Sequence, residues 1–231
     1  MAEFIHLRVH SEFSLIDGLV KIKPLVKTLA ERNVPAVAIT DQSNLYGLIK
    51  FYQAAMGAGI KPLVGVDVWI ANPQARDQPF RLSLYAMNDE GYHNLLELVS
   101  RGFTEGRYQD LAILQREWVA AQAEGLLALS GATAGDVGQA LLADKQSLAK
   151  ERASFWMSVF PSAYYLELQR TDRPDDEACV HASVALAMEL ACPVVATKDV
   201  PFISRDDFEA HEARVCIHAS RTLDDPRRER R

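Results

Sequence analysis

Four aspartates and one histidine stand where predicted strands end or have just ended. Asp17, Asp41, Asp67 and Asp199 each accompany a different short apolar segment, and His10 closes the first of these segments. In barrels of parallel strands, side chains at the carboxyl ends of the strands gather at one face. Carboxylates and imidazole together bind divalent metal ions and activate water, so this combination is typical of a metal-assisted hydrolase.

A simpler interpretation stays open for each of these residues. An aspartate directly after a strand often caps the N-terminus of the following helix and then needs no catalytic role. His10 could be an interior histidine whose hydrogen bonds are satisfied. Other catalytic signatures do not compete, because the chain has no G-x-S-x-G segment and the glycines at Gly131 and Gly135 lack the Lys-Ser/Thr of a phosphate-binding loop.

Strands that alternate with helices would position these residues. Apolar runs and period-two alternation predict six or seven strands, and capped helical stripes fall between them. This order predicts an α/β fold with a largely parallel sheet, either closed as a barrel or doubly wound. The predicted strands are 4–9, 34–39, 61–70, 80–87, 125–130, 164–168 and 193–196. The predicted helices are 24–30, 43–57, 91–102, 136–160 (as one helix or two), 175–191 and 205–218.

The second of these helices is rich in apolar residues. Ser43 or Asn44 is expected to cap its start, and Gly57 and Gly59 are expected to end it. One apolar stripe is expected to face the core. Its members are Leu45, Leu48, Ile49, Tyr52, Ala55 and Met56.

Composition restricts the classes of function. The 231 residues are 48% hydrophobic and 24% charged, as is usual for a globular protein. The net charge is −6. Segment 227–231 carries four Arg and one Glu (+3), so the rest of the chain has a net charge of −9. A domain this acidic is expected to bind a phosphate backbone weakly. Without a secretory signal or an 18-residue apolar run, and with cysteines that lack metal or disulfide spacing, the chain is expected to be cytoplasmic.

A set of sequence blocks identifies a family resemblance. Segment 6–18 (HLRVHSEFSLIDG) resembles the opening motif of the PHP (polymerase and histidinol phosphatase) domain, in the version that begins the α subunits of bacterial DNA polymerase III. Later blocks resemble the same family in the same order and cover nearly the whole chain. They are 38–47 (AITDQSNLYG), 59–67 (GIKPLVGVD), 88–96 (NDEGYHNLL), 127–131 (LALSG), 165–169 (YLELQ), 195–200 (VATKDV) and 222–226 (TLDDP).

The resemblance implies a fold and a domain organisation. The expected fold is α/β, a distorted (β/α)7 TIM-like barrel of the PHP type. Residues 1–226 are expected to form a single PHP domain. The basic tail 227–231 is expected to begin a link to the body of a longer polymerase chain.

The resemblance also implies a set of metal-ligand positions, of which this sequence keeps less than half. Ligand-type residues stand at four positions: His10, Asp17, Asp67 and Asp199. Five positions have lost theirs: Arg8, Gln42, Ala132, Thr171 and Pro201.

Arg8 is the most informative of these changes. A guanidinium keeps its charge in proteins and cannot ligate a cation. Arg8 therefore places a fixed positive charge where the metal would sit, and Lys198 could add a second. Asp41 belongs to the same carboxylate cluster, which would otherwise need a counter-ion. We interpret Arg8 as a substitute for the metal and expect the PHP site to be catalytically inactive.

Two functions remain open on this reading. The first is a scaffold without a cofactor of its own, which supports the polymerase body and docks the proofreading exonuclease (epsilon) subunit. In that case the longer polymerase would use Mg²⁺, and the isolated domain would bind DNA weakly and no membrane. The second is an active phosphoesterase with Zn or Mn, acting as a 3′–5′ exonuclease, a pyrophosphatase or a histidinol-phosphate phosphatase.

Overall fold

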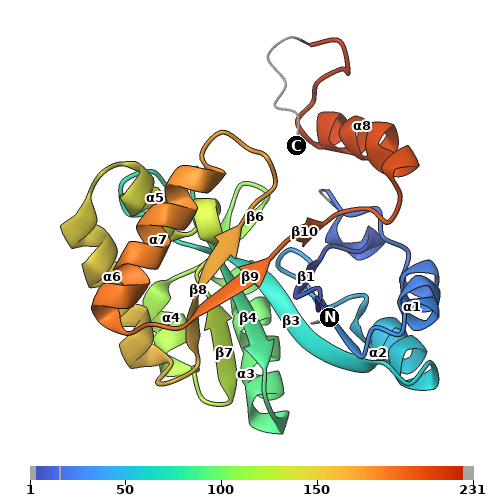
Figure 1. The fold of residues 1–231 in the computed structure, drawn as a ribbon, viewed down its shortest axis with the longest axis horizontal. Coiled ribbons are helices and arrows are strands. Elements are labelled where there is room, and N and C mark those ends of the chain that lie inside the picture. The colour runs from blue at the N-terminus through green and yellow to red at the C-terminus, as the bar shows by residue number, and fades with distance from the viewer. Residues whose placement is uncertain (1–3, 16, 226–231) are drawn as a thin grey trace. The chain divides into compact units, whose positions relative to one another are not determined.

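The computed structural model describes residues 4–15 and 17–225, which group into two compact units (Figure 1). The terminal unit combines residues up to Leu63 with those from Asp199 onward, and the central unit is Val64–Lys198. The basic tail 227–231 lies outside the described residues. The expectation of a single domain over 1–226 stays a prediction. Within the described residues, no helix is both long and apolar enough to cross a membrane.

The terminal unit is built on short parallel pairings between the two ends of the chain. Strand β1 (Arg8–Val9) pairs with β10 (Asp199–Val200), and Arg8 stands opposite Asp199. Strand β2 (Ala36–Ile39) follows the first strand, because the amide of Ala38 donates to the carbonyl of His6 over 2.9 Å. The helical elements are η1 (Glu12–Ser14), α1 (Ile22–Glu31), α2 (Leu48–Gly57), η3 (Arg205–Asp207) and α8 (Phe208–His218).

The central unit carries a mixed sheet in the strand order β5-β6-β3-β4-β7-β8-β9, and β2 pairs with β3 as the eighth strand of this ladder. Its strands are β3 (Lys61–Ile70, which begins in the terminal unit), β4 (Phe80–Ala86), β5 (Arg107–Tyr108), β6 (Leu111–Leu114), β7 (Leu126–Leu129), β8 (Tyr164–Gln169) and β9 (Val194–Thr197). Its helical elements are α3 (Asp89–Thr104), α4 (Arg116–Ala121), η2 (Ala132–Ala134), α5 (Asp136–Leu142), α6 (Gln146–Val159) and α7 (Asp176–Leu190).

The α/β class is confirmed, but the expectation of a largely parallel sheet is wrong at β4. This strand runs antiparallel to both of its neighbours, β3 and β7. The reason is the connection from β3 to β4, which is a loop over 71–79 without a helix. Such a connection reverses the chain direction, whereas a parallel neighbour needs a longer crossover. Among the described residues the strand ladders form an eight-stranded and a two-stranded sheet and do not close into one ring.

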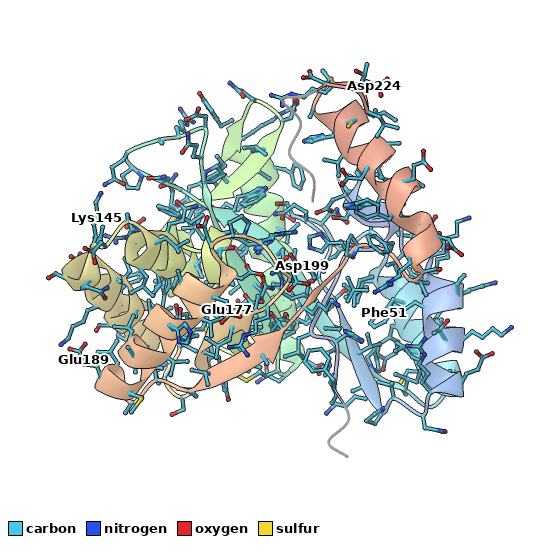
Figure 2. All side chains as sticks on the ribbon, turned by 45° about the horizontal axis from the view of Figure 1, so that its top comes forward. Phe51, Lys145, Glu177, Glu189, Asp199 and Asp224 are labelled. Atoms are coloured by element: carbon cyan, nitrogen blue, oxygen red, sulfur yellow. The ribbon has the colours of Figure 1, made fainter. Side chains whose placement is uncertain are left out.

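Helix α2 differs from its prediction at its start and on its surface. It begins at Leu48, whereas Asn44 forms a turn in which its side-chain oxygen accepts from the amide of Tyr46 (3.1 Å). The residues of α2 that face the core are Leu48, Phe51 and Ala55, and Phe51 is fully buried (labelled in Figure 2). The predicted stripe members Ile49, Tyr52 and Met56 are exposed. The prediction failed because this helix has apolar residues on two faces, and a count of apolar positions does not separate them.

Candidate functional site

A buried ion pair joins the two strands of the small sheet. The Nη1 atom of Arg8 lies 2.7 Å from the Oδ1 atom of Asp199, and the Arg8 side chain is 1% exposed against 21% for Asp199. The register of β1 and β10 sets the two residues opposite each other. A charge this deeply buried is tolerated only with a partner of opposite sign. The Arg8 guanidinium therefore pairs with the carboxylate of Asp199, a residue at which the family resemblance implies a metal ligand.

A second pair in the terminal unit consists of His10 and Asp17. Their Nδ1 and Oδ1 atoms are 2.9 Å apart, and the hydroxyl of Ser14 donates to the same carboxylate oxygen over 3.2 Å. The loop that carries Asp17 folds back onto the first strand at Gly18, where a Cβ atom would lie 1.9 Å from the carbonyl oxygen of Ser11. Only glycine allows this close approach, so the glycine of the opening motif has a structural role.

Asp41 is buried at the end of β2 and is held by one residue. Its two carboxylate oxygens accept from the amide of Ser11 (2.6 Å) and from the Ser11 hydroxyl (2.7 Å). Burial raises the pKa of Asp41 above its ordinary value, and the two bonds from Ser11 oppose that shift. The capping interpretation does not apply to Asp41, because its partner is 30 residues earlier in the chain and the next helix begins at Leu48.

The positions of Gln42 and Pro201 are also in the terminal unit. Gln42 is 8% exposed. Its side-chain amide donates to the Ser43 hydroxyl (3.1 Å), and its backbone N–H donates to the Ser14 hydroxyl (3.2 Å). The carbonyl of Pro201 accepts from the amide of Leu19 (2.7 Å). The terminal unit thus contains Arg8, His10, Asp17, Asp41, Gln42, Asp199 and Pro201.

The remaining predicted positions belong to the central unit. Asp67 lies inside β3 and accepts from the hydroxyl of Ser83, its register partner on β4, over 2.5 Å. Thr171 donates its amide (2.5 Å) and hydroxyl (2.8 Å) to Asp176 at the start of α7. Ala132 is buried in η2, and Lys198 is exposed.

A buried polar network in the central unit was not predicted from the sequence. The Gln169 side chain donates to Glu167 (3.1 Å) and to the hydroxyl of Thr197 (2.9 Å), which in turn donates to Glu167. The amide of Glu167 donates to the hydroxyl of Ser130 over 2.9 Å. The signal for this network was a charged residue in the middle of a strand, since Glu167 stands between Leu166 and Leu168 and is 1% exposed.

Three further residues of the terminal unit support the predicted site positions and were also missed. Ser11 and Ser14 supply the hydroxyls that hold Asp41 and Asp17. Arg214 of α8 donates to the carbonyls of Leu15 (Nε, 3.0 Å) and Glu12 (Nη2, 3.2 Å). Nothing in the sequence around Arg214 connects it with the opening motif, which lies about two hundred residues earlier.

The residues present do not fit a PHP metal cluster. Within the described part of the chain, no group of three or more His, Cys, Asp or Glu side chains could hold a metal ion. The donor chemistry gives the physical reason in the terminal unit. Arg8 brings a permanent positive charge to Asp199, and Gln42 offers a weak amide ligand at the position where the resemblance implies histidine.

Comparison with known proteins identifies close relatives over almost the whole chain. The chain is 55% identical over 227 residues to the DNA polymerase III subunit alpha of Pseudomonas aeruginosa, which is 98% of this chain and 19% of that protein. It is 49% identical over 227 residues to the subunit alpha of Escherichia coli, covering 98% of this chain and 20% of that protein. The chain thus spans about a fifth of the length of these relatives.

Solved structures share the fold at low sequence identity. An amidohydrolase from Chromobacterium violaceum, described with bound sulfate and no metal, superposes with a TM-score of 0.55 at 13% identity over 91% of this chain and 96% of that one. A two-domain protein from Bacteroides vulgatus, described as containing a predicted PHP-like metal-dependent phosphoesterase, gives 0.54 at 12% identity over 89% of this chain and 54% of that one. These likenesses confirm the expected PHP-type fold, a distorted TIM-like barrel.

The family itself is established by the sequence. The family model for the PHP domain matches residues 6–171, which include the opening motif and the strands up to β8. Because this match covers more than half of the chain, and the blocks quoted above occur in the family's order, the chain belongs to the PHP domain family.

Proposed function

We propose that this chain is the PHP domain of a bacterial DNA polymerase III α subunit, and that it works as a scaffold without a metal ion. The relatives at 55% and 49% identity support the polymerase assignment, because both carry that name. The longer protein would be a DNA-directed DNA polymerase that uses deoxynucleoside triphosphates and Mg²⁺. Its polymerase carboxylates would lie outside these 231 residues.

The observation that carries the scaffold proposal is the ion pair between Arg8 and Asp199. Hydrolysis by a PHP metal cluster needs carboxylate and imidazole donors around an ion that activates water. Here the guanidinium neutralises Asp199 at 2.7 Å, so a cation at that carboxylate would have to displace a charge that cannot be removed by deprotonation. The fold is retained and its hydrolytic chemistry is lost.

A scaffold in a replicative polymerase would act by binding protein. We propose that the partners are the polymerase body of the same chain and the proofreading exonuclease (epsilon) subunit. The net charge of −6 favours this role over direct DNA binding, because the phosphate backbone is held by clustered Lys and Arg. An acidic domain can also pair with a basic segment of a protein partner.

The competing function is a metal-dependent phosphoesterase with Zn or Mn. Its support is the set of ligand-type residues that remain in the terminal unit, where His10 and Asp17 lie 2.9 Å apart. One structural neighbour is described as containing a predicted PHP-like metal-dependent phosphoesterase. It is only 12% identical to this chain, so the likeness concerns the fold alone.

Titration of the purified chain separates the two functions. The chain is titrated against the exonuclease subunit of a close relative and, separately, against primed DNA at physiological salt. It is also assayed for phosphoester hydrolysis with Zn²⁺ and with Mn²⁺. We expect saturable binding of the exonuclease subunit, weak and salt-sensitive binding of DNA, and no hydrolysis.

Two results would overturn the proposal. The first is metal-dependent hydrolysis that is lost in the His10→Ala variant and unchanged in a His93→Ala control, since His93 is on the exposed surface of α3. The second is sub-micromolar binding of DNA without binding of the exonuclease subunit.

A further inference from the structure

Helix α2 presents apolar side chains to solvent as well as to the core. Its inward face consists of Leu48, Phe51 and Ala55, all buried. On another face, Ile49 is 64% exposed, Tyr52 48% and Met56 55%. These three residues are three and four positions apart, so they lie in one row along the helix. We call Ile49, Tyr52 and Met56 the α2 stripe.

The exposed surface of α2 lacks the charges that usually cover a solvated helix. Its one ionisable side chain other than Tyr52 is Lys50, whose Nζ lies 3.4 Å from Glu12 and 5.3 Å from the ring centroid of Phe13. The lysine is therefore directed to η1 and leaves the stripe uncharged. Tyr46, in the turn before the helix, is 66% exposed and adds an aromatic residue to this surface. A helix that is apolar on more than one face is normally covered on both.

We propose that the α2 stripe is the docking surface for the polypeptide that lies outside this region in the longer relatives. This inference rests on the proposed function, because it takes the chain to be one domain of a polymerase subunit. The relatives supply the occupant: the chain aligns over 98% of its own length and only 19% of theirs. Most of the relatives' polypeptide is thus available to cover this face.

The size and chemistry of the stripe favour an occupant in the same polypeptide. Separate proteins that associate stably use about 20–30 residues a side, and their interfaces are as polar as the ordinary surface. The stripe offers three uncharged side chains on one helix. A linked domain is held at a high effective concentration, so a small apolar contact suffices between domains. The expected partner surface is likewise apolar and free of charge, with Tyr52 and Met56 as anchors.

Thiol labelling tests the inference directly. The variants Met56→Cys, on the stripe, and Lys27→Cys, on α1 of the same unit, are made in the 231-residue chain and in the longer natural polypeptide. Lys27 is a suitable control because its side chain is 78% exposed, and the natural cysteines Cys179, Cys192 and Cys216 are buried. Each protein reacts with a maleimide under native conditions, and the rate is followed by mass spectrometry.

We expect M56C and K27C to react at similar rates in the 231-residue chain. In the longer polypeptide M56C should react at least tenfold more slowly than in the shorter chain, while K27C keeps its rate. Tyr52→Cys repeats the measurement at a second stripe position, which guards against a fold defect in one variant. Equal rates for the stripe variants in both proteins would overturn the inference.

Other occupants give different results, and each of these also overturns the inference. Protection of M56C that grows with the concentration of the 231-residue chain would mean a second copy. Protection only after addition of the exonuclease subunit would mean that partner. DNA synthesis by the longer polypeptide is measured in the same preparations. If the longer polypeptide synthesises DNA but its M56C variant reacts as fast as in the 231-residue chain, the docking surface is rejected and the proposed function is kept. If the longer polypeptide does not synthesise DNA, the proposed function is rejected.

Discussion

Arg8 and Asp199 face each other across a parallel pair of strands, with Nη1 and Oδ1 2.7 Å apart. Strand register fixes this relationship, because a slip by one residue would turn Arg8 to the other side of the sheet. The two residues come from opposite ends of the sequence, so the ion pair also fastens the end of the chain to its beginning. The stability of the terminal unit and the scaffold proposal therefore depend on the same contact.

The first prediction concerns that contact. Arg8→Met should lower the free energy of unfolding by roughly 2 to 4 kcal/mol, because it removes the guanidinium from a partly buried carboxylate. Arg8→Lys should lower it less, since the charge is kept and only the forked geometry is lost. The double variant Arg8→Met/Asp199→Asn should recover part of the loss. Urea denaturation measures all three, and an unchanged midpoint for Arg8→Met would contradict the role given to Arg8.

The second prediction concerns metal content. Elemental analysis of the purified and dialysed chain should find no stoichiometric zinc or manganese, because too few donors remain for even a four-coordinate site. The variant Arg8→His restores a His-x-His spacing with His10 and removes the fixed positive charge. It should retain more zinc than the natural chain. Two or more ions per natural chain would show that the guanidinium does not replace the metal.

The third prediction concerns pH. Burial raises the pKa of Asp41 above its ordinary value of 3.8, so the folded state keeps this proton to higher pH than the unfolded state. Stability contributed by Asp41 is therefore present below 3.8 and declines as pH rises from 3.8 through the folded-state pKa. Asp41→Asn removes this dependence while its amide can still bond to Ser11.

Urea midpoints of the natural chain and Asp41→Asn, measured from acid to neutral pH, give the test. The urea midpoint of Asp41→Asn should increase relative to that of the natural chain as pH rises. An Asp206→Asn control, at an exposed carboxyl of η3, should run parallel to the natural chain. A difference that is constant over the whole range would mean that Asp41 titrates alike in the folded and unfolded states.

The fourth prediction concerns Arg214, which is a positioning residue for the loop after β1. It donates to the carbonyls of Leu15 and Glu12, and Leu15 has a φ of +64°, a region that L-residues seldom adopt. Arg214→Ala should loosen this loop. Amide exchange at Ser14, whose N–H donates to Ser11, should accelerate about tenfold, as expected for loss of about 1.4 kcal/mol.

Exchange elsewhere provides the comparison for this variant. The amides of β8, in the central unit, should keep their rates, and Arg205→Ala, at an exposed position of η3, should leave the rate at Ser14 unchanged. Acceleration throughout the chain would mean that Arg214 stabilises the fold in general and does not position this loop in particular.

Regular elements were predicted well where local signals agree. The strand over Lys61–Ile70 was predicted with both ends correct, because its apolar run has clear limits. The segment 136–160 was predicted as one helix or two, and the structure has two, α5 and α6. The short elements β5, β6 and α4 were missed, since two to six residues carry too little periodicity to stand out.

Some contacts of the predicted site positions could be expected from the sequence, and others could not. His10 and Asp17 were expected at the end of the same first strand, and their side chains lie 2.9 Å apart. Ser11 could not be assigned to Asp41 from the sequence, because their contact joins residues 30 positions apart. The network around Glu167 depends on the pairing of β8 with β9, which is a tertiary fact. Strand pairing, which single-sequence patterns do not encode, accounts for most of what was missed.

The terminal unit is assembled from the two ends of the described chain, coloured blue and red in Figure 1, while the central unit is one continuous segment. A ribosome therefore releases the whole of Val64–Lys198 before Asp199 can reach Arg8. During that interval β1 has no β10 to pair with, and a guanidinium destined for burial stays in water. We expect the central unit to form first during translation, and the Arg8–Asp199 pair to be among the last contacts made.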